Sequence, residues 1–146
     1  MENTKVQNFK NHTRVVPGYH MFVAGVFLVN FGWRLYLLKD GISFASIFEV
    51  LMAAAFIALF FYARIFVLTV QDRVIRLEMQ LRLERLLAPE LRPRIAEFTL
   101  PQMISLRFAP DDELPLLAQQ VLEEKLTDRK AIKRRIKNWR ADFLRA

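Results

Sequence analysis

The sequence predicts an all-α protein, in which a two-helix transmembrane hairpin leads into a small helical cytoplasmic module. Three observations predict this class. Two apolar runs of membrane-spanning length follow each other closely, a stretch without Gly or Pro leads on from the second run, and no segment after Gly41 has a convincing strand pattern. The length of 146 residues agrees with one compact domain or one small membrane unit.

Two apolar runs form the predicted hairpin. The first occupies residues 19–38 and the second about 44–66, and each supplies the roughly 20 residues that a span needs. Between them, "KDGIS" is a turn in which Gly41 is the expected left-handed residue. A cleaved signal peptide is disfavoured, because the first run follows a mostly polar segment and lacks a small-residue cleavage site at its end. The expected parts of the chain are an N-terminal segment 1–18, the hairpin 19–70 and the module 71–146.

Basic residues flank the hairpin outside its loop. Three precede the first run, and three lie at or beyond the end of the second: Lys5, Lys10, Arg14, Arg64, Arg73 and Arg76. The loop holds only Lys39, which Asp40 balances. Because cytoplasmic flanks carry the excess of Lys and Arg, we expect both termini in the cytoplasm.

Each apolar run contains a charge at a similar depth. Arg34 lies seven residues before Gly41 and Glu49 eight residues after it. In an antiparallel hairpin both then lie roughly 10 Å from the loop. Charges inside a membrane tend to pair, so we expect an Arg34–Glu49 ion pair; the alternative is that each side chain reaches the interface independently. Transport is disfavoured, because an ion pathway normally needs more than one such pair.

Three glycines recur seven residues apart on the first helix, at Gly18, Gly25 and Gly32. Small residues allow helix backbones to approach closely in lipid. The second run is rich in alanine, so packing of the glycine stripe within the hairpin is favoured. A seam between two subunits stays open as the alternative.

The second helix is expected to continue to about Leu87, because neither Gly nor Pro occurs from Arg64 to Ala88. Beyond the membrane it has two apolar faces at helical spacing. One comprises Val74, Leu77 and Leu81, and the nearly opposite one comprises Ile75, Met79, Leu83 and Leu86. One face is expected to hold the chain's own later helices, which leaves the other for a second subunit or another protein.

Short helices are expected after Pro89 and Pro93. Thr99 is a candidate N-cap with Pro101 in the first turn, and either Asp111 or Asp112 is expected to cap the next helix. Thr127 is the expected cap of the last helix.

The last helix, residues 128–144, is expected to be amphipathic and strongly basic, because residues 129–146 hold eight basic side chains and one acidic. Its apolar stripe comprises Ile132, Ile136, Trp139 and Phe143, and its basic face comprises Lys130, Lys133, Arg134 and Lys137. We expect the stripe to pack on the module, which leaves the basic face open to anionic lipid headgroups or a soluble anion.

Residues that support catalysis are scarce. The chain has no cysteine, and its two histidines, His12 and His20, lie before the first span or at its start. No nucleotide, zinc-protease or hydrolase motif is present. The acidic run 111–113 is interpreted as helix capping rather than a cation site, and haem ligation by His20 is disfavoured. We expect no enzymatic activity, no metal and no cofactor.

Three segments carry a resemblance to a known family: "FKNHTRVVPGYH" (9–20), "LTVQDRVIRLEMQLRLERLL" (68–87) and "LTDRKAIKRRIKNWRADFLR" (126–145). Together they resemble an uncharacterised bacterial family of small two-span membrane proteins, known only as a domain of unknown function. The resemblance covers nearly the full length and implies a bacterial inner-membrane protein. It implies no activity, cofactor or catalytic residue.

The leading hypothesis is a non-enzymatic inner-membrane adaptor or scaffold that associates with itself or with an unidentified membrane partner. The alternative is a membrane-tethered protein that binds nucleic acid or anionic lipid through the basic helix. Nucleic acid is disfavoured, because the turn before that helix lacks glycine and membrane-proximal basic helices commonly meet anionic lipid.

Overall fold

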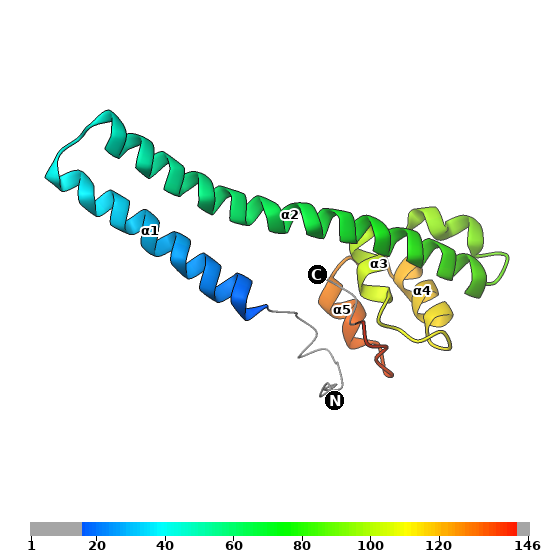
Figure 1. The fold of residues 1–146 in the computed structure, drawn as a ribbon. Coiled ribbons are helices and arrows are strands. Elements are labelled where there is room, and N and C mark those ends of the chain that lie inside the picture. Colours follow the sequence, from blue (N-terminus) through cyan, green and yellow to red (C-terminus); the bar gives the residue numbers. More distant parts are fainter. Residues whose placement is uncertain (1–15, 143–146) are drawn as a thin grey trace. The chain divides into compact units, whose positions relative to one another are not determined.

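The computed structural model describes residues 16–142, and this part of the chain is helical with no strand (Figure 1). It divides into two compact units, one of residues 16–68 and the other of residues 69–142. The elements are η1 (Gly18–Val23), α1 (Ala24–Leu37), η2 (Leu38–Asp40), α2 (Phe44–Leu86), η3 (Arg92–Glu97), α3 (Leu100–Leu106), α4 (Leu114–Glu123) and α5 (Arg129–Arg134). The prediction of an all-α chain is confirmed for the described residues.

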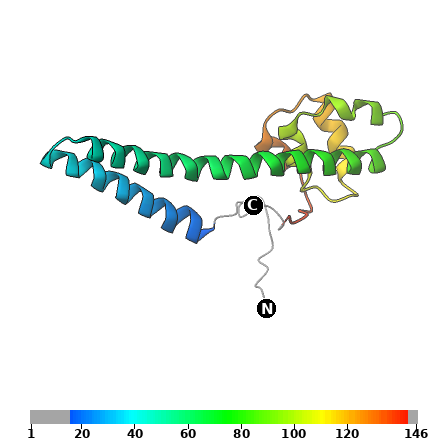
Figure 2. The same cartoon turned by 45° about the horizontal axis from the view of Figure 1, so that its top comes forward.

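The first unit is a helical hairpin. α1 and the first half of α2 run antiparallel, as both Figure 1 and Figure 2 show. Gly41 lies between η2 and α2 with a φ of 140°, in a region that side chains disfavour, so the predicted need for glycine at this turn is confirmed. The second helix also continues as predicted, because α2 runs without interruption from Phe44 to Leu86.

Both helical segments are long and apolar enough to cross a membrane. The first extends over Gly18–Asp40, 23 residues, and the second is the 43-residue α2. At about 1.5 Å per residue α2 is roughly 65 Å long, about twice the length that a bilayer core requires. Their apolar side chains are largely exposed in this unit, as Phe22 and Phe44 illustrate. A surface of this kind suits a lipid environment.

Aromatic rings hold the hairpin together. Phe27 stacks on Phe56 with ring centroids 5.6 Å apart, and Tyr19 stacks on Phe60 at 4.4 Å. The Tyr19 hydroxyl also donates a hydrogen bond to the carbonyl oxygen of Phe60. Ala53 is buried in the same unit.

The favoured packing of the glycine stripe within the hairpin is wrong. A methyl group built on Gly18, Gly25 or Gly32 would meet no atom within 4 Å. The bulky rings of Tyr19 and Phe27 contact α2 instead, so the glycines face open space.

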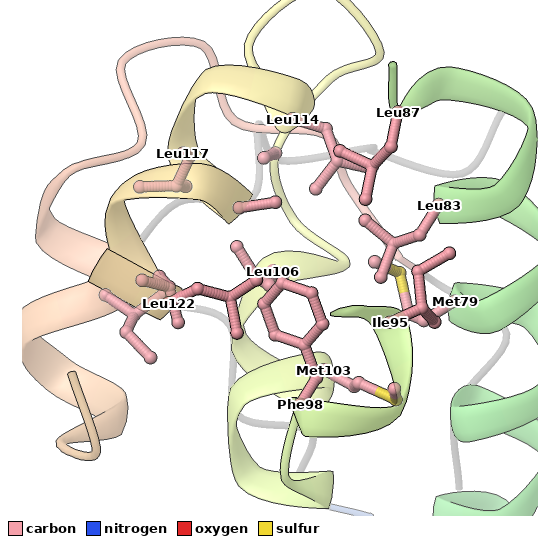
Figure 3. Close-up of a cluster of buried hydrophobic side chains, with 14 of the residues drawn as sticks. Met79, Leu83, Leu87, Ile95, Phe98, Met103, Leu106, Leu114, Leu117 and Leu122 are labelled. Carbon is pink, nitrogen blue, oxygen red and sulfur yellow. The ribbon is translucent and has the colours of Figure 1, made fainter. Parts of the chain in front are cut away.

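The second unit packs the last part of α2 against η3, α3, α4 and α5. Figure 3 shows its core, in which Met79, Leu83 and Leu87 meet side chains from the later helices. The buried members are Ile75, Met79, Leu83, Leu87, Ile95, Phe98, Met103, Ile104, Leu106, Ala109, Leu114, Leu117, Ala118, Val121, Leu122 and Ile132.

Specific hydrogen bonds define the helix ends in this unit. Thr99 caps α3 as predicted, and its backbone N–H donates to Gln102 Oε1 at 2.7 Å. The other two predicted caps are wrong. α4 begins after Glu113 rather than after Asp111 or Asp112, because Asp111 is engaged elsewhere. α5 is capped by Asp128, whose carboxylate accepts the N–H groups of residues 130 and 131.

Candidate interaction surface

The part of α2 beyond residue 68 has two apolar faces, of which one is buried and the other is exposed. Ile75, Met79 and Leu83 are buried in the core of the second unit. On the other side of the helix, Leu77 is 59% exposed and Leu81 is 60% exposed, against 0% for Leu83. The predicted division of the helix into one occupied and one vacant apolar face is thus visible within this unit.

We call the vacant side the open face, and it comprises Val70, Val74, Leu77 and Leu81. All four side chains are exposed. Their spacing of four, three and four residues is the spacing of core positions in a coiled coil. Val70 is the last residue of the predicted hairpin, whereas Val74, Leu77 and Leu81 lie beyond it. An apolar stripe beyond the membrane is costly to leave exposed, so these residues mark a candidate docking surface.

Charged residues border the open face. Arg73 and Glu78 lie on its two sides, and both are exposed. Within the described residues neither forms an ion pair. Arg73 is therefore available to a partner that binds the open face, and Glu78 lies between that face and the cleft that holds Arg107 and Arg140.

Asp111 anchors α2 to the rest of the unit. The Arg82 Nε donates to Asp111 Oδ1 at 2.6 Å, and Arg85 Nη2 lies 3.0 Å from Asp111 Oδ2. Arg82 also donates to the carbonyl oxygens of Arg107 at 3.2 Å and Ala109 at 2.6 Å. This network fixes the rotation of α2 and so determines which face stays open.

Electrostatics agree with this arrangement. The hydrogen bond from Arg82, reinforced by the charges of Arg82, Arg85 and Arg140, holds the pKa of Asp111 below its ordinary value. Burial lowers the pKa of the Arg82 guanidinium, and Asp111 opposes that effect. Asp111 therefore remains a carboxylate and Arg82 a cation at neutral pH.

A cleft of about 860 Å³ lies beside the open face. Val74 and Leu81 contribute to one wall, and Arg107 and residues 140–142 form the other. The guanidinium of Arg107 is bound to Asp142 at 3.0 Å. The cleft is thus lined by arginines that already bind carboxylates or backbone carbonyls, which is typical of a structural network.

The predicted basic helix of residues 128–144 is wrong in length. α5 ends at Arg134, and the described chain after it is not helical. The cause is tertiary hydrogen bonding. The Glu113 carboxylate accepts the N–H groups of Lys137 at 3.0 Å and Asn138 at 2.9 Å, and the N–H of Arg140 donates to the carbonyl of Phe108 at 2.7 Å.

The apolar residues predicted for that helix still reach the module. Ile132 is fully buried, Ile136 packs against the core, and Trp139 stacks on Phe108 with ring centroids 4.5 Å apart. Phe143 lies outside the described residues. The expected packing of Trp139 on the module is present, although the segment that carries it is irregular rather than helical.

The four residues of the predicted basic face do not share a helix. Lys130, Lys133 and Arg134 belong to α5, whereas Lys137 lies beyond its end. The ammonium group of Lys133 lies 5.1 Å from the ring centre of the buried Phe108, so part of this charge faces the module. The alternative hypothesis, binding of nucleic acid or lipid, required a long basic helix over residues 128–144. The described residues do not form that helix, because α5 ends at Arg134.

In the hairpin unit, the structure brings Arg34 and Glu49 together. Arg34 Nη1 lies 2.9 Å from Glu49 Oε2, which is the length of a charge-assisted hydrogen bond. Both side chains are partly exposed in the isolated unit.

The described residues contain no group of three or more His, Asp or Glu side chains that could hold a metal ion. The imidazole of His20 is hydrogen-bonded locally to the backbone of Val16. Asp111 binds arginines, and Glu113 binds backbone N–H groups, so the acidic run serves the fold.

Comparison with known proteins places the chain in a family. All of residues 1–146 match a family of unknown function, DUF6526. The chain belongs to the DUF6526 family. No curated protein and no solved structure matches it.

Two structural residues of this DUF6526 chain escape prediction from the sequence. Asp111 was expected to cap a helix, yet it binds Arg82 from 29 residues away. Glu113 was interpreted as part of the same helix cap, yet its carboxylate accepts backbone N–H groups 24 and 25 residues later. These bonds prevent α5 from continuing as a helix. Only the charge of these residues signalled a polar role, because their partners are distant in sequence.

Proposed function

We propose that this DUF6526 chain is a non-enzymatic, membrane-anchored adaptor or scaffold. The hairpin lies in the bacterial inner membrane, with both termini and the second unit in the cytoplasm. The open face of α2 binds another protein chain. The single observation that supports this function is the exposure of Val70, Val74, Leu77 and Leu81 on a helix whose opposite face is already filled.

The Arg34–Glu49 pair supports the membrane location. Each charge alone would be costly in a bilayer, and pairing at 2.9 Å lowers that cost. The basic flanks support the orientation, because the loop between the helices carries one lysine balanced by one aspartate.

The anchor and its orientation are tested by fusions to a reporter that is active only in the cytoplasm. Fusion at residue 146 should give activity, and fusion at Gly41 should give none. The reverse pattern would refute the orientation and the cytoplasmic placement of the open face.

Occupancy of the open face is tested by thiol labelling in native membranes. The chain has no cysteine, so a single introduced thiol is the only reactive one. If a partner covers the face, Leu77→Cys should react with a maleimide at least several-fold more slowly than Arg76→Cys. Arg76 is the matched control, because it is exposed on the same helix away from the open face. Equal rates would refute the adaptor function.

A further inference from the structure

We infer that the partner of the open face is a second copy of this chain, bound in parallel as a two-stranded coiled coil. This inference rests on the proposed function, because it assigns the occupant of the same surface. It is carried by the register of the apolar residues and by the charges beside them.

The register follows from the spacing. A step of four residues joins a d position to the next a position, and a step of three joins a to d. Val70 and Leu77 are therefore d residues, and Val74 and Leu81 are a residues. Val74 at a with Leu77 at d is the combination that favours two parallel strands, whereas Val70 at d and Leu81 at a are the reverse of it. The charges beside the seam are therefore the stronger support for the parallel arrangement.

The charges match this register in a parallel pair. Arg73 then occupies a g position and Glu78 the e position of the next heptad. In a parallel dimer, each g residue faces the partner's e residue five positions later in sequence. Arg73 of one copy thus faces Glu78 of the other, and two-fold symmetry forms this pair twice. Neither residue has an ion pair within the described part of its own chain, although Glu78 also lines the cleft that holds Arg107 and Arg140.

The rest of the fold permits this contact. Ile75, Met79 and Leu83, which bind the module, lie nearly opposite the open face, so the core of the module does not cover the seam. The module approaches the open face on one side only, where Arg107 and residues 140–142 form the far wall of the cleft beside Val74 and Leu81. Because α2 is already held helical by that packing, association costs little ordering of the backbone.

Membrane anchoring favours the parallel orientation. Copies inserted with the same topology present α2 to the cytoplasm in the same direction. Confinement to one bilayer also raises the effective concentration of copies, which offsets the shortness of a seam of two heptads.

The inference is tested in native membranes with single cysteines in the full chain. Residues at a and d meet their own counterparts in a parallel dimer, so Val70→Cys, Leu77→Cys and Leu81→Cys should each form a disulfide-linked species of twice 17.2 kDa on mild oxidation. Arg76→Cys is the control and should give at least fivefold less.

The identity of the partner is checked with two copies of different tag length. Co-expression should give a crosslinked species of intermediate mass. Crosslinking of Val70→Cys only to Leu81→Cys would indicate an antiparallel pair and overturn the inference.

Charge exchange tests the register independently. Arg73→Glu alone places like charges opposite each other twice, as does Glu78→Arg alone, and each should lower the crosslinking yield of Leu77→Cys roughly tenfold at low salt. A mixture of the two variants restores opposite charges at both pairs and should recover the yield as a heterodimer. No recovery would overturn the assigned register.

Failure of the inference differs from failure of the proposed function. If Leu77→Cys is protected from maleimide but yields no more homodimer than Arg76→Cys, another protein occupies the face and the second copy is refuted. If protection disappears once residues 1–15 are deleted, that segment is the occupant and the inference is likewise overturned. If Leu77→Cys is not protected at all, both proposals fall.

Discussion

Leu83→Ala should strongly destabilise the second unit, whereas Leu116→Ala should not. Leu83 is fully buried between α2 and the later helices, and Leu116 is 64% exposed on α4. Leucine and alanine have similar helix propensities, so the comparison isolates burial. Leu116 also lies outside the open face, so any association of copies does not affect the control.

The expected magnitude follows from the burial. Truncation of a buried leucine costs about 2–5 kcal/mol, and because Leu83 is completely buried we expect a cost of about 3 kcal/mol. The exposed control should cost less than about 0.5 kcal/mol. A urea m-value of about 1.5 kcal/mol/M, reasonable for a unit of this size, converts these costs to midpoint shifts of about 2 M and less than about 0.4 M.

Trp139 fluorescence in the full chain provides the assay. Its ring stacks on Phe108 in the core of the second unit, and Trp33→Phe removes the only other tryptophan. Urea titration in a mild non-ionic detergent then follows this unit alone. Equal midpoints for Leu83→Ala and Leu116→Ala would refute the assignment of Leu83 to the core and, with it, the division of α2 into two faces.

Three further predictions concern charges and rings. Because the pKa of Asp111 is lowered in the folded state, the ionised carboxylate stabilises the fold fully above its unfolded pKa of about 3.9, and this stabilisation is lost as the pH falls through the folded pKa. The urea concentration at the unfolding midpoint should therefore decrease when the pH is lowered below about 4. Asp111→Asn should make this decrease smaller. Arg34→Leu or Glu49→Leu alone should lower the yield of folded protein in detergent, by a cost of up to about 3 kcal/mol, whereas the double variant should recover much of it; losses that simply add would exclude coupling. Phe108→Leu should shift Trp139 emission to the red in the Trp33→Phe background, and an unchanged spectrum would show that the stack does not shield the indole.

The hairpin and the extent of α2 could be predicted because their signals are local. Apolar runs of spanning length, a glycine in the turn and the absence of helix breakers all act within a few residues. The positive φ of Gly41 and the unbroken course of α2 to Leu86 follow from these signals. The pairing of Arg34 with Glu49 could be anticipated from equal distances to the same turn.

The end of the chain could not be predicted in the same way. Residues 135–142 have helical periodicity, but Glu113 and Phe108 bind the backbone N–H groups that a longer helix would use internally. These bonds join positions at least 24 residues apart, so no local pattern reveals them. The same reason explains Asp111, whose arginine partner lies on a different helix.

The alternation of apolar and polar residues at 77–83 illustrates how two helical faces can imitate a strand. Leu77, Met79, Leu81 and Leu83 lie two residues apart, as in a half-buried strand. In a helix, however, a step of two residues is a rotation of about 200°, so successive members fall on opposite sides. Met79 and Leu83 are accordingly buried, and Leu77 and Leu81 are exposed. A helix that packed on one side only would carry polar residues at 77 and 81. The period of two therefore indicates a helix with apolar residues on two opposite faces. The later helices of the same chain cover only one of these faces.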